Sequence, residues 1–345
     1  MDPIQLREPL QSLINRIFIN RNMKKIVMAA LGLVLGSMLY SQQLSQLSQY
    51  LQNEYLINPA AAGLSNYVDM NLSFRQQWVG FDNAPKTYYY SVNSIVGGTS
   101  NTPMYNPSLR TGRAQGVVKT PTVSTGKIKH AVGGNIISDE YGAFKKFSFN
   151  GSYAIHIPIS KEMNIATGIG LGMTSFRFLQ DRVNLLNDVD NTYSVFLGNN
   201  QKKNYFDLNM GLWLYTKDFF FGYSNAKVMR NDASFGAPTD SRLNVHHYIS
   251  GGYKIQVSPE LAITPNFLIK YMNPAPIAMD FNAKIEYQDF IFGGLSYRHK
   301  DALVGLIGVM FNNFKLGYSY DFTISNLRKH NSGGHEIIFG YRIKL

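Results

Sequence analysis

The seven histidines are the first residues to test for chemistry, because the sequence contains no cysteine. Without cysteine, thiol catalysis, disulfides and cysteine-ligated metals are excluded. His246 and His247 are adjacent, so in a strand their side chains point to opposite faces and cannot share a metal ion. His330 and His335 flank the turn 331–334, where we expect them to lie at a rim. The histidines therefore predict no metal site and no cofactor.

One histidine has the spacing for hydrolysis. His156 and Ser152 lie on the polar face of a predicted strand, where they could act as base and nucleophile of a membrane-embedded hydrolase. No nucleophile elbow or ordered base accompanies them, so a polar side chain facing the interior is the plainer interpretation. Glycine pairs such as 97–98 and 133–134 suggest phosphate loops, but no helix with a lysine and a hydroxyl follows them. We expect a protein that is not an enzyme.

Composition favours a sheet-rich membrane protein. Charged residues make up 16% of the 345 residues, aromatic residues make up 13%, and there are 30 glycines. After the N-terminal region no apolar run approaches the length of a membrane helix. Low charge with many aromatic residues and glycines is typical of an outer-membrane β-barrel. The net charge of +11 is scattered along the chain, which argues against a nucleic-acid partner and favours lipid headgroups or an acidic partner.

The N-terminal region is predicted to be removed. Met23, Lys24 and Lys25 precede the apolar run 26–40, so residues 23–41 are interpreted as a secretory signal peptide. A single membrane anchor is the alternative, but the run is short for one. Residues 1–22 are interpreted as an upstream extension ahead of a second start.

A short segment separates the signal peptide from the strands. Within this segment, residues 42–66, a weak helical stripe runs from Gln42 to Tyr55 and should stop at Asn58 and Pro59, because proline disfavours helix in the residue before it. Two interpretations stay open for this N-terminal segment. It is either a frayed terminus or a short periplasmic plug that enters the lumen.

From residue 67 onward hydrophobicity alternates with a period of two. In 314–325 the even positions, Phe314 to Ile324, are apolar and the odd positions are polar or small, as in a strand with two different faces. A soluble sandwich would also alternate, but its outward face should be charged. Fourteen strands are predicted, at 67–74, 87–95, 127–138, 145–157, 163–177, 205–216, 218–228, 245–257, 261–271, 277–288, 289–299, 302–312, 314–325 and 335–345.

These strands predict an all-β fold, a transmembrane antiparallel up-and-down β-barrel of about 14 strands that occupies 67–345 in the cell outer membrane. The last strand should close the barrel against the first near Tyr67. Three long connections, 97–126, 179–204 and 229–244, are expected on one side of the barrel, with short turns on the other.

The connection between the first two strands has an unusual density of polar and aromatic residues. It contains Arg75, Gln76, Gln77, Trp78, Gly80, Phe81, Pro85 and Lys86. We expect this hairpin on the periplasmic side, with Trp78 and Phe81 as interface aromatics and Arg75 and the glutamines tying the turn to the plug segment or to a lumenal partner. Direct binding of a partner protein is the alternative.

Four stretches carry motifs of a known family, around 48–63, 75–87, 273–276 and 317–342. The matching positions are Asn58, Pro59, Gly63, the arginine-glutamine-glutamine-tryptophan run from Arg75, and Asp321, His335, Glu336 and Arg342. In these stretches the sequence resembles the PorP/SprF family of type IX secretion outer-membrane proteins of Bacteroidota.

The resemblance implies a non-enzymatic barrel that binds, helps export or anchors a secreted protein with a C-terminal sorting domain, often an adhesin. It also implies periplasmic partners, namely motor-ring and peptidoglycan-binding components, and contact with outer-membrane lipid. A diffusion channel or uptake porin is the alternative, suggested by the polar strand faces and by the charge of about +8 that remains after residues 1–41 are removed.

Overall fold

The computed structural model describes residues 46–65, 67–97, 127–183, 202–231, 243–288 and 290–344. The predicted upstream extension and signal peptide (1–41) lie outside the described residues, as do parts of the three long connections, and these predictions stay predictions. Within the described ranges no helix has both the length and the apolar character needed to cross a membrane.

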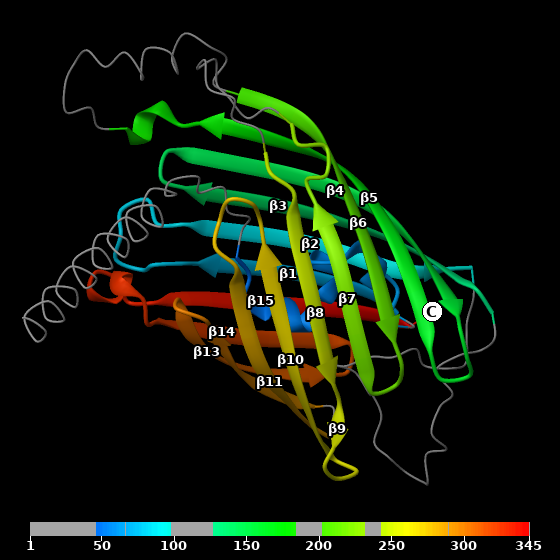
Figure 1. Ribbon diagram of the computed structural model, residues 1–345. Helices are drawn as coiled ribbons and strands as arrows, with labels where there is room; N and C mark the ends of the chain where they lie inside the picture. The colour runs from blue at the N-terminus through cyan, green and yellow to red at the C-terminus, as the bar shows by residue number, and fades with distance from the viewer. Residues whose placement is uncertain are drawn as a thin grey trace, which may run out of the picture. The chain divides into compact units, whose positions relative to one another are not determined.

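The described strands form one antiparallel sheet that closes on itself (Figure 1). The strands are β1 (Tyr67–Gln76), β2 (Lys86–Val96), β3 (Lys129–Tyr141), β4 (Phe144–Pro158), β5 (Asn164–Phe178), β6 (Lys202–Tyr215), β7 (Phe219–Ala226), β8 (His246–Tyr253), β9 (Ile255–Gln256), β10 (Leu261–Tyr271), β11 (Ala278–Tyr287), β12 (Ile291–Arg298), β13 (Ala302–Phe311), β14 (Phe314–Thr323) and β15 (Gly334–Lys344).

Closure occurs where β1 pairs with β15, in a register that runs from Tyr67 opposite Lys344 to Gln76 opposite His335. β8 and β9 both pair with β10 and are two parts of one wall strand, interrupted at Lys254. The wall therefore has fourteen strand positions. The predicted 14-strand barrel, closed by its last strand against its first, is confirmed.

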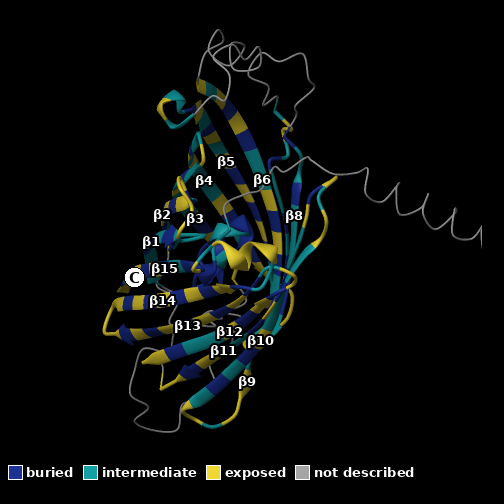
Figure 2. Ribbon diagram, turned by 90° about the vertical axis from the view of Figure 1, so that its left-hand side faces the viewer, coloured by how far each residue is buried: buried dark blue, intermediate teal, exposed yellow. Residues whose placement is uncertain are grey.

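The strands expose apolar side chains and bury polar ones. Along β14 exposed and buried residues alternate at every position, and Figure 2 shows this alternation on β13 and β14. Leu316 is 52% exposed while its neighbour Lys315 is fully buried. Exposed apolar residues and buried lysines would be unfavourable in water, but they are expected when lipid surrounds the wall and polar groups fill the lumen.

The two ends of the barrel differ. We call the end that bears the 77–85 connection the hairpin end, and the end where β1 begins and β15 stops the terminal end. Residues 179–201 and 227–245 join strands at the hairpin end, whereas 97–128 joins β2 to β3 at the terminal end. The expectation that the three long connections share one side is wrong, because three strand crossings separate the first of them from the second.

The number of strand crossings also decides at which end of the barrel the hairpin lies. One crossing by β1 carries the chain from the terminal end to the 77–85 connection. The other turns at the terminal end are short, at 159–163, 216–218, 257–260, 288–290 and 312–313. Short turns are typical of the periplasmic side, which favours an outward hairpin end over the periplasmic placement that the sequence predicts.

The N-terminal segment lies inside the ring of strands, where Figure 1 draws it in blue. Instead of the helical stripe expected up to Tyr55, it forms three 3-10 turns, η1 (Gln49–Gln52), η2 (Glu54–Leu56) and η3 (Pro59–Ala61). Asn53 has φ and ψ of −154° and 74°, outside the helical region, which separates the first two turns. Asn58 caps the third by accepting from the Ala60 N–H at 2.9 Å. We call residues 46–65 the lumen segment.

Candidate functional site in the barrel lumen

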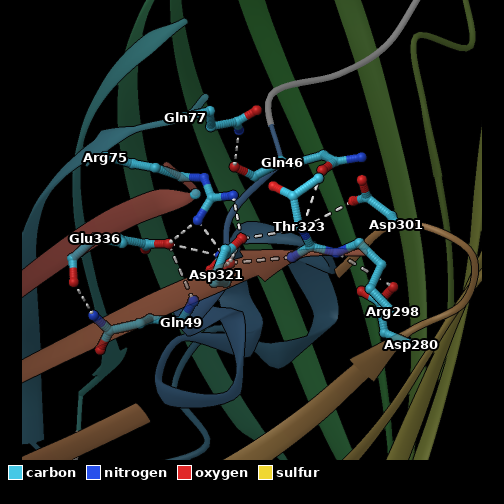
Figure 3. A network of polar contacts seen from close by, with 12 residues as sticks. Gln46, Gln49, Arg75, Gln77, Asp280, Arg298, Asp301, Asp321, Thr323 and Glu336 are labelled. Atoms are coloured by element: carbon cyan, nitrogen blue, oxygen red, sulfur yellow. Dashed lines mark hydrogen bonds and ion pairs between the residues drawn. The ribbon is translucent and has the colours of Figure 1, made fainter. Parts of the chain in front are cut away.

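A cluster of buried charge holds the lumen segment near the hairpin end (Figure 3). Arg75 places Nη2 2.7 Å from Asp321 Oδ2 and Nη1 3.3 Å from Glu336 Oε2. The Arg75 side chain is 2% exposed and that of Glu336 is fully buried. Charges at this depth are tolerated only when they are paired and hydrogen-bonded. The cluster therefore ties β1, β14 and β15 together across the closing seam of the barrel.

Ser48 lies at the centre of this cluster and belongs to the lumen segment. Its backbone N–H donates to Glu336 Oε2 at 2.6 Å, and its hydroxyl lies 2.8 Å from both oxygens of Asp321. Arg75 Nη1 donates to Ser48 Oγ at 2.6 Å, and Arg298 Nη2 does so at 3.1 Å. One small side chain thus joins two arginines to a carboxylate, and its exchange would leave several buried donors and acceptors without partners.

The cluster continues along β10, β11 and β12. Arg298 Nη1 lies 3.2 Å from Asp321 Oδ2 and 3.2 Å from Asp301 Oδ2, and its Nε lies 3.7 Å from Asp280 Oδ1. Lys270 Nζ completes the row at 2.9 Å from Asp280 Oδ2. Each charge in the row has a partner of opposite sign, which offsets the cost of burying it.

Deeper in the lumen, the wall makes room for the segment by lacking side chains. Asn58 Nδ2 donates to the Leu212 carbonyl at 2.9 Å and to the Tyr223 carbonyl at 3.2 Å. A Cβ at Gly211 would overlap Asn58 Oδ1, so only glycine permits this approach. Further wall glycines face the segment in the same way, at Gly133, Gly168 and Gly317. The fit shows that the wall sequence accommodates this segment in particular.

The candidate hydrolase pair is not assembled. His156 Nε2 lies 2.8 Å from the Ala62 carbonyl, which can only accept, so the proton is on Nε2 and Nδ1 accepts from the Tyr215 hydroxyl at 3.0 Å. Ser152 Oγ bonds instead to the Tyr55 hydroxyl at 2.7 Å. Four residues of strand separate the two Cα atoms by about 13 Å. Both side chains hold the lumen segment rather than each other.

A small cavity of about 40 Å³ lies beside the segment toward the terminal end. Its lining includes Gln52, Glu54, Asp69 and Asn93. Burial raises the pKa of the Glu54 carboxyl to about 7, partly opposed by the nearby Lys284. This volume admits a few water molecules and no larger ligand. Among the described residues, no group of three or more histidines and carboxylates is placed to bind a metal ion.

The sequence matches a known family over residues 39–341, the family described as type IX secretion system membrane protein PorP/SprF. The chain belongs to the PorP/SprF family. As a secretion-system membrane protein that closes into a β-barrel, this family member lies in the outer membrane. No curated protein matches the sequence.

Solved structures of similar fold are outer-membrane proteins of low sequence identity. The Ralstonia pickettii toluene transporter TbuX is 10% identical, with 85% of this chain and 94% of that chain covered and a TM-score of 0.49. The P. putida toluene transporter TodX is 9% identical, with 84% and 92% covered and a TM-score of 0.48. The Acinetobacter baumannii outer membrane protein Omp33 is 8% identical, with 81% and 100% covered and a TM-score of 0.42.

Some of the sequence-predicted site residues of this PorP/SprF protein converge in the lumen. Arg75, Asp321 and Glu336 meet in the charged cluster. Gln77 Nε2 donates to the Gln46 carbonyl at 3.2 Å, which links the hairpin to the lumen segment. Asn58, Pro59 and Gly63 all belong to that segment, and the Gly63 N–H donates to Asn93 Oδ1 at 3.0 Å.

The other predicted residues lie elsewhere. Arg342 is near the terminal end, where its Nε lies 3.3 Å from Asp69 Oδ1. His335 is at the outer surface, where its Nδ1 lies 2.7 Å from the Tyr318 hydroxyl. The remaining ones belong to β1, to the start of β2 and to the connection between them, namely Gln76, Trp78, Gly80, Phe81, Pro85 and Lys86. Gly80 has φ of 110°, which explains glycine in this turn.

Sequence reasoning missed Ser48, Arg298 and Asp280 as members of the cluster. Arg298 on β12 and Asp280 on β11 alternate with apolar residues, as Asp321 does on β14. This alternation predicts that all three side chains face the lumen. Ser48 had no such signal, because its role depends on a segment that crosses the lumen rather than on any strand period.

Proposed function

We propose that this protein is a non-enzymatic outer-membrane barrel of the type IX secretion and gliding machinery, and that it binds, helps export or anchors a secreted protein with a C-terminal sorting domain. The observation that carries the proposal is the family match, which covers the lumen segment and nearly all of the barrel. A surface adhesin is the cargo we favour. Periplasmic motor-ring and peptidoglycan-binding components are proposed to meet the terminal end.

The occupied lumen supports binding at the rim. The lumen segment contacts the wall from Ser48, near the hairpin end, to Gly63, which bonds to β2 toward the terminal end. Most of its residues are buried, including Gln49, Tyr50 and Ala60. A cargo polypeptide would therefore have to displace a segment held by buried ion pairs before it could enter, whereas the rim is reached without that cost.

The hairpin 77–85 is the rim element we propose for cargo contact. It is braced from the side, since the Val79 N–H donates to the Gly333 carbonyl at 2.9 Å and the Ser332 N–H donates to the Val79 carbonyl at 2.7 Å. Phe81 is 38% exposed at its tip. A fixed loop with an exposed aromatic residue loses little conformational entropy on binding.

Display of a sorting-domain protein on cells tests this proposal. A strain that lacks the gene should lose display while small-solute uptake is unchanged, and wild-type complementation should restore it. Phe81→Ser should assemble the barrel but reduce display severalfold, because it removes the exposed ring. Ile159→Ser is the matched control, since Ile159 is 57% exposed in a turn at the terminal end. Normal display of every sorting-domain protein in the deletion strain would refute the proposal.

An uptake porin is the competing function, suggested by the polar residues that face the lumen, such as Thr264 and Lys315. Purified protein in planar bilayers separates the two functions. An occupied barrel should give no stable conductance. Steady open channels from the wild-type protein, together with impaired solute uptake in the deletion strain, would replace the secretion proposal with the porin.

A further inference from the structure

The basic turn after β14 lies against the lipid-facing wall. The 3-10 turn η5 (Asn326–Lys329) follows β14 at the hairpin end and has two cations in its last turn, Arg328 and Lys329. Both side chains are exposed, and the preceding Leu327 is 39% exposed. The proposed cargo contact at the hairpin 77–85 does not use these residues.

The position of Arg328 connects this turn to the membrane boundary. Its Cζ lies 5.3 Å from the centroid of the Phe322 ring, within the range of a cation–π contact. Phe322 is 44% exposed and ends the outward row of β14, which also contains Tyr318 and Tyr320. The guanidinium is thus held at the upper limit of the apolar wall, where lipid headgroups begin.

Aromatic side chains below the turn have the arrangement expected at a membrane interface. The Tyr318 hydroxyl lies 2.7 Å from His335 Nδ1, and the Tyr320 hydroxyl donates to the Ser332 carbonyl at 2.8 Å. The rings of Tyr320 and His335 lie 5.1 Å apart. Aromatic rings with one polar edge concentrate at headgroup level in membrane proteins. Toward the hairpin end, the outward-facing residues of the wall are therefore first apolar, then aromatic and finally cationic.

Hydrogen bonds tie the turn to its neighbours on both sides. The N–H groups of Ile324 and Ser325 donate to the Asp301 carbonyl at 2.8 and 3.2 Å. Asn331 Oδ1 accepts from Thr323 Oγ1 at 2.9 Å and from the Gly333 N–H at 2.8 Å. Bonds to the hairpin 77–85 hold its other side. The two cations are therefore presented on a fixed frame, which lowers the entropy cost of binding.

We propose that Arg328 and Lys329 form a binding site for the phosphate-bearing headgroup of an anionic lipid in the leaflet at the hairpin end, with the lipid chain against Phe322 and Leu327. A lipid fits better than an acidic protein because the guanidinium is stacked on a residue of the lipid-facing row. The carboxylate of the neighbouring turn 299–301, Asp301, is already paired with Arg298 at 3.2 Å.

Binding of phosphatidylglycerol by the folded barrel in neutral detergent, measured by native mass spectrometry, tests the proposal. Arg328→Gln with Lys329→Gln should weaken binding about thirtyfold, since each cation near a lipid surface contributes about fivefold. Phe322→Leu keeps both charges and the apolar wall but removes the ring, so it should weaken binding by a smaller factor. Phosphatidylcholine, which has a phosphate but no net charge, should bind the wild-type protein far more weakly.

The matched control is Lys161→Gln with Lys217→Gln, which removes two exposed lysines from turns at the terminal end. It should leave phosphatidylglycerol binding unchanged. Equal losses in the two double variants would mean that net charge rather than a site attracts the lipid, and would overturn the proposal. Unchanged lipid binding in the Arg328 and Lys329 variant would overturn it too, as would a preference of that turn for an acidic peptide over the lipid.

Discussion

Replacing Arg75 by methionine should destabilise the barrel more than any surface change, because it strands a buried carboxylate. The guanidinium lies 2.7 Å from Asp321 and 3.3 Å from Glu336, and it is 2% exposed. Asp321 would keep Arg298 at 3.2 Å. Glu336, which is fully buried, would keep only neutral donors, chiefly the Ser48 N–H at 2.6 Å.

The expected loss of unfolding free energy follows from this difference between Asp321, which keeps an arginine, and Glu336, which does not. Breaking a buried ion pair by removing one partner costs about 3–5 kcal/mol of unfolding free energy. We expect the lower end of this range, about 3 kcal/mol, because Asp321 stays paired and the methionine side chain still fills the volume of the arginine stem. Urea unfolding of the barrel in detergent micelles, followed by tryptophan fluorescence, measures the change.

Two further variants decide whether the reasoning is right. Adding Glu336→Gln to Arg75→Met removes the stranded charge and should recover a substantial part of the loss, which is the signature of direct coupling. Arg177→Met is the matched control, since Arg177 is exposed on β5 and its loss should change stability by less than about 0.5 kcal/mol. A loss below about 1 kcal/mol for Arg75→Met, or no recovery in the double variant, would refute the account.

Three other predictions concern the lumen segment. Gly211→Val should displace Asn58 and raise the ion conductance of the barrel. Gly151→Val is the control, because a Cβ at Gly151 meets open space, and it should leave the conductance unchanged. Equal conductance of the two variants would contradict the tight fit. Because the pKa of Glu54 rises from 4.5 to about 7 on folding, the unfolding free energy should fall as pH rises between those values, and Glu54→Gln should flatten that part of the profile. His156→Gln should leave lipid turnover in cells unchanged, and reduced turnover would revive the hydrolase.

The membrane-facing surface was predictable from sequence because it depends on a local rule. Side chains alternate across a strand whatever the rest of the chain does, so the assignment of Phe314 to the outside and Lys315 to the inside followed from their positions alone. Closure of β15 on β1 also followed, since a barrel in lipid leaves no edge unpaired. The interruption at Lys254, within one predicted strand, had no comparable signal.

The prediction that the three long connections share one end of the barrel is wrong, because it did not count the strands between them. The sequence shows how long each connection is. Two connections lie at the same end of the barrel only when an even number of strands separates them. Three strands separate the 97–128 connection from the 179–201 connection, which places them at opposite ends. By the same parity, the hairpin 77–85 lies at the end opposite the start of β1.

By itself the sequence determined the class of fold, the number of strands, the face that each strand turns to lipid and the family, because all of these depend on spacing within short stretches. Only the tertiary structure decided that Arg75, Asp321 and Glu336 meet around Ser48, and that wall glycines such as Gly211 leave room for Asn58. Those contacts join residues that are up to 288 positions apart. No local pattern encodes such a contact, because it exists only once the sheet has closed around the segment inside it.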